Sequence, residues 1–217
     1  MEVLLVPGLV ALAVLAGGTA LWVERRRRQA LSTLAQQRGW QLVDRDDVWT
    51  GAFEGEPFGR GARRRAESVL TGVHGGRDVV AFDYSFRTHS TDGEGRRQVH
   101  THRYAVVVLR LPVPVPLVEL EASRLPRLFG RGIELESEEF NHRYRVRADD
   151  PRLAHDVLPP RTVQLLLERP DLSLRLLGGV ALSWRPGRLE ATDLRRRLET
   201  MTAVLDAVPA WVWKDRA

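Results

Sequence analysis

The chain has 217 residues, contains no cysteine, and carries 33 basic against 28 acidic residues, a formal net charge of +5. Because cysteine is absent, disulfide frameworks, thiolate metal sites and a cysteine nucleophile are excluded. With 43% apolar residues, the chain can bury a sizeable core, which excludes a wholly disordered or collagen-like protein.

An uncharged run of 21 residues, from Val3 to Val23, opens the chain. As a helix this run would measure ~31 Å, which is enough to cross the hydrocarbon core of a bilayer. Trp22 lies at its end, where aromatic side chains favour the membrane interface. We therefore predict a transmembrane anchor over residues 1–24.

Four arginines, Arg25, Arg26, Arg27 and Arg28, follow the apolar run. Basic residues beside a span stay in the cytoplasm, so the cluster predicts a single-pass signal anchor with its N-terminus outside and its C-terminal domain in the cytoplasm. A cleaved signal peptide would instead carry basic residues before its apolar core. An exported envelope protein stays open as an alternative. The arginines either bind anionic lipid or only set the topology.

The basic excess is confined to the segment after the apolar run. Residues 25–65 hold ten arginines against five acidic residues, whereas residues 66–217 hold 23 basic against 21 acidic residues. A nucleic-acid binder needs a basic stripe with interleaved aromatic side chains or a known module. The sequence therefore predicts no nucleic-acid partner, and the expected partners are the membrane and an unidentified protein.

The helix is predicted to continue past the arginines, because Leu31, Leu34 and Ala35 repeat at helical spacing and Gly39 ends the pattern. Glycine and proline are frequent from residue 51 to residue 61, which is typical of a linker. We predict a basic juxtamembrane helix and linker over residues 25–65 and a cytoplasmic domain over residues 66–217. A chain beginning near Gln41 should then fold alone.

Strand patterns begin at residue 67. Residues 67–74 and 77–86 flank a Gly-Gly pair and predict a β-hairpin. Residues 99–111 predict a long strand that is buried in its apolar middle. Three prolines follow between residues 112 and 116 and place that segment at an edge or a crossing. Residues 172–184 contain a second Gly-Gly pair and predict another hairpin.

Residues 133–136 and 144–147 alternate apolar with charged residues and predict two strands with one solvent-facing side. The turn between them is predicted to place Phe140 in the core. On this reading the glutamates at positions 134, 136, 138 and 139 face solvent and do not form a carboxylate pair for acid–base chemistry.

Helices are predicted late in the chain. Asp150 before Pro151 is typical of a helix start, and a second short helix precedes Pro170. A final helix capped by Thr192 or Asp193 carries an apolar stripe as far as Val208. Trp211 and Trp213 then predict either a strand or an apolar segment that packs against the domain. Hairpins followed by helices indicate an α+β domain with an antiparallel sheet and late helices.

The run from Gly132 to Pro151 contains Leu135-Glu136, Phe140, Tyr144, Val146 and Asp150. It resembles the pattern L-E-x-x-x-F-x-x-x-[FY]-x-V-x-x-x-D of a bacterial family named only as domain of unknown function three-one-three-seven. The resemblance extends more weakly from Gly72 to Trp184. It implies a membrane-spanning segment ahead of the domain, and it brings no activity, cofactor or catalytic residue.

Two histidines, His100 and His102, alternate on the predicted long strand and point the same way, so they could chelate a divalent metal together with His89. Two imidazoles supply only half of a tetrahedral shell. We therefore predict no metal, cofactor or catalytic residue, and favour a non-enzymatic interaction module. A metal-dependent enzyme that uses these histidines is the alternative.

Overall fold

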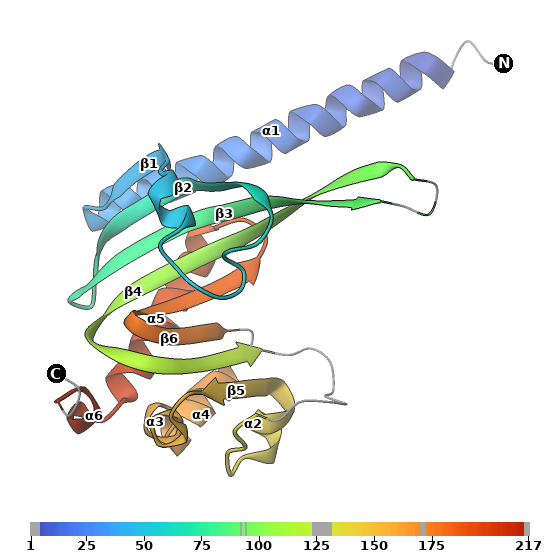
Figure 1. Ribbon diagram of the computed structural model, residues 1–217. Helices are drawn as coiled ribbons and strands as arrows, with labels where there is room; N and C mark the ends of the chain where they lie inside the picture. Colours follow the sequence, from blue (N-terminus) through green and yellow to red (C-terminus); the bar gives the residue numbers. More distant parts are fainter. Residues whose placement is uncertain (1–4, 92, 94, 123–131, 170–171, 215–217) are drawn as a thin grey trace.

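The computed structural model describes residues 5–91, 93, 95–122, 132–169 and 172–214, and it describes the side chains of 18, 19 and 21 onward within the first helix. A six-stranded antiparallel sheet lies at the centre, in the order β1-β2-β3-β4-β5, and β6 pairs with β4 (Figure 1). The predicted α+β class is confirmed. The strands are β1 (Gln41–Arg45), β2 (Ala62–His74), β3 (Arg77–Thr91), β4 (Arg97–Ala122), β5 (Tyr144–Ala148) and β6 (Ser173–Pro186).

Helices precede and follow the strands. A long helix opens the described chain, and short helices gather after β4 and at the C-terminal end, where a helix replaces the strand considered for Trp211 and Trp213. The helices are α1 (Leu5–Arg38), η2 (Asp47–Thr50, a 3-10 turn), α2 (Glu138–Arg143), α3 (Pro151–Val157), α4 (Pro160–Glu168), α5 (Ala191–Ala207) and α6 (Ala210–Lys214).

The sheet is folded into two wings because β4 and β6 bend together. Before its three prolines β4 pairs with β3, and after them it pairs with β5, while β6 follows β4 along both parts. The register shifts between Arg110 and Val118, across the prolines. We call the part that contains β1, β2 and β3 the upper wing, and the part that contains β5 the lower wing (Figure 1).

The hairpin predicted over residues 172–184 is wrong, because β6 is one continuous strand. Gly178 has a φ of 55° and pairs with Val115 at the bend of β4. A glycine pair in which one residue has a positive φ can close a hairpin or bend a strand, and the sequence pattern is the same in both cases. Here the bend carries β6 from the lower wing to the upper wing.

The main core lies between one face of the sheet and the helices. It contains Leu31 and Leu34 of α1, Phe140 of α2 and the apolar side of α5. Phe140 is fully buried as predicted, although its segment is a short helix capped by Ser137 and not a turn. The strand predicted over residues 133–136 is reduced to one bridge between Ile133 and Val146.

A second, aromatic core lies on the opposite face of the upper wing. Residues 46–61, which we call the strap, cross this face, and their aromatic rings pack on the sheet. The ring of Phe58 lies 4.7 Å from that of Tyr84, and the ring of Phe53 stacks on Phe82 at 6.2 Å. The predicted linker is therefore part of the folded domain.

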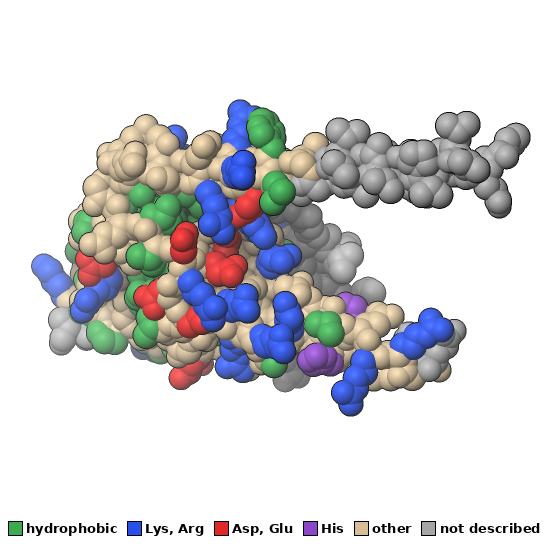
Figure 2. Space-filling model, turned by 90° about the horizontal axis from the view of Figure 1, so that it is seen from above, with side chains coloured by type: hydrophobic (Ala, Val, Ile, Leu, Met, Phe, Trp, Pro, Cys, Tyr) green, Lys and Arg blue, Asp and Glu red, His purple; other side chains and the backbone are tan. Residues whose placement is uncertain are grey.

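The hairpin of β3 and β4 extends beyond the body of the domain, in the same general direction as α1 (Figure 1). Arginine and histidine side chains follow it toward its end, whereas both charge signs are mixed over the body (Figure 2). His89 and Val99 pair across this hairpin, and both are exposed.

The C-terminal part of α1 is joined to the sheet by a buried ion pair. Arg27 is 6% exposed, and its Nη1 atom donates to Asp83 Oδ2 at 2.9 Å and to the carbonyl oxygen of Leu189 at 3.0 Å. Trp40, just after the helix, is also buried. The folded unit thus begins within α1, and the boundary predicted at residue 66 lies inside β2.

This arrangement changes the expectation for a shortened chain. A chain beginning near Gln41 lacks Arg27, Leu31, Leu34 and Trp40, all of which are buried in the intact domain. It would leave the Asp83 carboxylate without its cationic partner and part of the core open. We therefore do not expect such a chain to fold stably on its own.

Arg27→Ala should lower the free energy of unfolding by ~3–5 kcal/mol, because it leaves a buried carboxylate without its partner. The adjacent Arg28, whose side chain is 59% exposed, is the matched control, and Arg28→Ala should change the same quantity by less than ~0.5 kcal/mol. Urea unfolding of the full chain in detergent measures both. Equal effects would show that Arg27 has no special structural role.

Phe140→Ala should cost ~3–5 kcal/mol, since the ring is fully buried and its removal leaves a cavity. The exposed Val99, changed to alanine, should cost less than ~0.5 kcal/mol. The same unfolding measurement applies, and a loss below ~1 kcal/mol for Phe140→Ala would contradict the packing described here.

Candidate functional site

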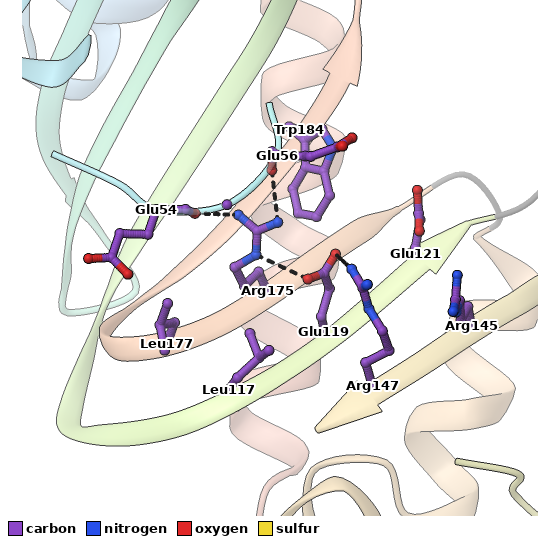
Figure 3. Close-up of a pocket in the computed structure, with 11 residues that line it drawn as sticks. Glu54, Glu56, Leu117, Glu119, Glu121, Arg145, Arg147, Arg175, Leu177 and Trp184 are labelled. Carbon is purple, nitrogen blue, oxygen red and sulfur yellow. Dashed lines mark hydrogen bonds and ion pairs between the residues drawn. The ribbon is translucent and has the colours of Figure 1, made fainter. Parts of the chain in front are cut away.

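A charged cleft opens where the two wings meet the strap (Figure 3). It consists of two adjoining hollows of about 550 Å³ and about 750 Å³. Glu56, Glu121 and Trp184 line both hollows, so the two form one continuous feature. Together their linings contain six acidic and seven basic side chains, which leaves the cleft close to neutral.

Alternation along the lower-wing strands places the charges in the cleft. Val118 and Leu120 of β4 point into the main core, so Glu119 and Glu121 point to the other face. Tyr144 and Val146 of β5 are likewise in the core, which leaves its arginines on the cleft side. The register pairs Glu119 with Arg147 and with Arg175, and Glu121 with Arg145. Each glutamate and its register partners form a row of opposite charges across the strands, which we call a rung. The first rung is Glu119 with its two arginines, the second is Glu121 with Arg145, and the two lie side by side.

The first rung is closed. Glu119 is 5% exposed, and its Oε1 atom accepts from Arg147 Nη2 at 3.0 Å while Oε2 accepts from Arg175 Nε at 3.3 Å. Both carboxylate oxygens thus have a charged donor. This satisfies the requirement that a buried charge be paired and hydrogen-bonded.

Arg175 also holds the strap and the upper wing. Its Nη1 and Nη2 atoms donate to the carbonyl oxygens of Glu54 at 2.7 Å and Glu56 at 2.8 Å. Its guanidinium carbon lies 4.7 Å from the centre of the Trp184 ring, within the range of a cation–π interaction. One buried arginine therefore connects both parts of β6, β4 and the strap (Figure 3).

The second rung is open. Glu121 and Arg145 are register partners on β4 and β5, yet no ion pair joins them in the part of the chain that the structure describes. Glu121 is exposed, and the Nε atom of Arg145 is buried without a hydrogen-bond partner. Both side chains lie on the cleft side of their strands (Figure 3). This rung thus presents one anion and one cation with spare hydrogen-bonding capacity.

The second hollow is bordered by a paired cluster on α5. Asp193 accepts from Arg185 Nε at 2.8 Å and from Arg196 Nη2 at 3.1 Å. Arg197 donates to Ser183 Oγ and to the carbonyl oxygen of Ala105. Burial lowers the pKa of Arg197 to about 10, against the opposing attraction of Asp193. These charges hold α5 on β4 and β6.

The residues predicted to set the membrane topology lie away from the cleft, on α1. Trp22 is 60% exposed, and Arg26 lies over its ring at 5.3 Å. Arg25, Arg26 and Arg28 are exposed, whereas Arg27 is buried. Most of the apolar run from Val3 to Val23 falls outside the residues whose side chains are described. Across the described residues, no helix has the length and apolar composition of a membrane span.

The three histidines do not converge. His100 Nε2 lies 2.8 Å from Ser90 Oγ, and His102 Nε2 lies 2.9 Å from Thr88 Oγ1. His89 pairs with Val99, and alternation places it on the opposite face of the hairpin from His100 and His102. In the described ranges, no group of three or more histidine, aspartate or glutamate side chains is placed to hold a metal ion.

Sequence reasoning missed the charged cleft. Glu119, Arg145 and Arg147 follow the alternation of a strand with one solvent-facing side, and nothing local shows that two such strands meet. One signal was available in β6, where Arg175 is the only charged residue in the run Leu172-Ser-Leu-Arg-Leu-Leu. A lone arginine within an apolar strand needs a buried partner.

Comparison with known proteins gives one fold neighbour. No family model matches the chain, and no curated protein matches it. The chain is similar to a solved structure, the crystal structure of the mycobacterial trehalose monomycolate transport factor A, TtfA, with a TM-score of 0.58 and 15% sequence identity. The match covers 85% of this chain and 95% of the other. At this identity it shows a shared fold.

Arg175→Ala should lower the free energy of unfolding by about 3 kcal/mol, because it removes a buried charge together with its bonds to the strap. Arg147→Ala removes the other partner of Glu119, but its side chain is 48% exposed, so the loss should stay below about 1 kcal/mol. Arg175→Lys keeps the charge without the planar fork and should fall between the two. Equal losses for Arg175→Ala and Arg147→Ala in urea unfolding would contradict the role of Arg175 in joining the strap to the sheet.

Proposed function

We propose that the protein is a single-pass membrane protein whose α+β domain lies in the cytoplasm and acts as a non-enzymatic interaction module. The charged cleft is its binding site for a segment of another protein. The observation that carries this proposal is the cleft itself, which is close to neutral and lined by charges of both signs.

The membrane anchor is supported by the sequence of α1. The uncharged run from Val3 to Val23 is long enough to span a bilayer, and the arginines that follow it favour the cytoplasmic side. The structure divides these arginines by environment. Arg25, Arg26 and Arg28 are exposed and available to set topology or to contact anionic lipid, whereas Arg27 is bound to Asp83.

A protein partner is supported by the mixed charge of the cleft. Nucleic acid presents a dense array of negative charge and is bound by surfaces of one sign. A polypeptide segment can carry both signs at fixed spacing, which matches a cleft whose acidic and basic side chains alternate across β4, β5 and β6. Glu121 and Arg145 are lining charges of opposite sign that form no ion pair with each other, and both could contact such a segment.

The fold neighbour is a trehalose monomycolate transport factor. We extend this to the present chain only as a proposal that the module serves a transport assembly. Membership of the family three-one-three-seven likewise stays a proposal. The alternative of a metal-dependent enzyme has no support from geometry, because His89 lies on the opposite face from His100 and His102.

The proposed topology predicts the behaviour of a reporter fused after Ala217. A reporter that works only in the cytoplasm should be active there, and one that works only after export should be inactive. Replacing Arg25, Arg26 and Arg28 together by alanine should weaken this orientation, because fewer positive charges then keep the C-terminal side of the span in the cytoplasm. An exported reporter active in the unaltered chain would establish the envelope alternative instead.

A matched control separates topology from general charge. Replacing Arg103, Arg152 and Arg195, three exposed arginines elsewhere in the domain, by alanine removes the same charge and should leave the orientation unchanged. Arg27 is left intact in both variants, so that neither removes the buried ion pair with Asp83.

The module is tested by site-specific photo-crosslinking in intact membranes. A photoreactive residue in place of Ser173, which lines the cleft, should form a defined crosslink to another protein. The same residue in place of the exposed Val73, near the end of β2 and outside the lining of the cleft, should not. A crosslink from Val73 without one from Ser173 would place the interface elsewhere and refute the proposed site.

A further inference from the structure

We infer that the open rung, Glu121 with Arg145, is the part of the charged cleft that recognises the partner, and that it takes an extended segment carrying a carboxylate and a cationic side chain. The carboxylate binds Arg145, and the cation binds Glu121. This inference rests on the proposed function and names the chemistry of its ligand.

The first argument comes from hydrogen bonding. The Nε atom of Arg145 is buried and has no acceptor, and a desolvated donor without a partner carries a free-energy cost. A carboxylate that binds side-on to a guanidinium accepts from Nε and from one Nη at the same time. A bound carboxylate would therefore remove that cost and gain a bidentate contact.

The second argument comes from the contrast with the closed rung. Glu119 already accepts from two arginines, and Arg175 donates to one carboxylate and two carbonyl oxygens. A ligand would have to displace these buried contacts to bind there. The open rung offers the same two chemical groups without an ion pair between them in the described residues.

The third argument concerns the spacing of the two charges. Side chains that face each other on neighbouring antiparallel strands have Cβ atoms about 5 Å apart. In an extended segment, residues i and i+2 lie on one face about 7 Å apart. Because glutamate and arginine side chains are long, an acidic and a basic residue two positions apart on such a segment can reach both members of the rung.

Other occupants fit the charges less well. An anionic membrane surface or a nucleic acid would bring mainly negative charge near Glu121, and near the exposed Glu54 and Glu56 of the strap that border the same cleft. A metal ion would bring only positive charge near Arg145. A segment that carries both signs meets each group with its opposite.

The test uses the full chain in detergent and blocked five-residue peptides as probes. One peptide carries aspartate and arginine separated by one glycine, and the others replace the aspartate by asparagine, the arginine by glutamine, or both. Binding is measured by titration, and the NMR signal of the Arg145 Nε–H group is followed. The doubly charged peptide should bind at least about 10-fold more tightly than the uncharged one, and it should shift that signal.

Variants identify the groups responsible. Arg145→Gln and Glu121→Gln should each reduce the affinity for the charged peptide to near that of the uncharged peptide. Arg110→Gln is the matched control, because Arg110 is exposed and forms its ion pair with Asp78 on the upper wing. It should leave binding unchanged.

Several results would overturn the inference. They are equal affinity for all four peptides, insensitivity to both variants, or an equal shift of the Arg145 signal by inorganic phosphate, which would indicate a simple anion site. If the photoreactive residue at position 173 still crosslinks another protein in membranes, any of these results refutes recognition by Glu121 and Arg145 but leaves the cleft as the proposed binding site. If the crosslink is absent while the charged peptide binds as expected, the proposed module fails and the peptide site stands.

Discussion

The buried ion pair between Arg27 and Asp83 determines how α1 lies on the domain. Burial raises the pKa of Asp83, and the backbone N–H of Leu189 and the charge of Arg27 oppose that rise. The pKa of Asp83 is therefore higher in the folded chain than in the unfolded chain. The free energy of unfolding falls as the pH rises from the unfolded pKa to the folded pKa, because Asp83 ionises more readily in the unfolded chain. Removing one partner is costly because it leaves a buried charge unpaired, whereas the intact pair contributes orientation more than net stability. It joins α1, β3 and the segment before α5 at one point.

Local patterns in the sequence were sufficient for the elements whose cause is local. The end of α1 at Gly39, the hairpin at Gly75 and the start of α3 after Asp150 each depend on a cap or a turn within a few residues. The continuous β6 could not be predicted in this way. Whether its glycine pair closes a turn or bends a strand depends on the bend of β4, about 60 residues earlier in the chain.

The charged cleft depends on contacts of the same long range. The sequence shows that Glu119, Arg147 and Arg175 each occupy a strand, and alternation predicts the face on which each lies. Their meeting depends on the strand order, which places β4 between β5 and β6 in the lower wing. Arg27 was misassigned for a different reason. It stands in a run of four arginines, so the sequence suggests the same topology role for all four, although Arg27 is buried. Only the helix position of Arg27 directs it at Asp83.

The projecting hairpin reaches almost as far from the domain as α1 does. From Arg27 to Leu5 the helix rises ~33 Å, and from Asp83 to Thr91 β3 rises ~27 Å in the same general direction (Figure 1). The hairpin carries Arg87, His89 and Arg97, and such polar strands are too costly to place in hydrocarbon. If residues 3–23 cross a bilayer, the helix and the hairpin must separate from this arrangement, so that the polar strands stay at the headgroups while the helix enters the hydrocarbon.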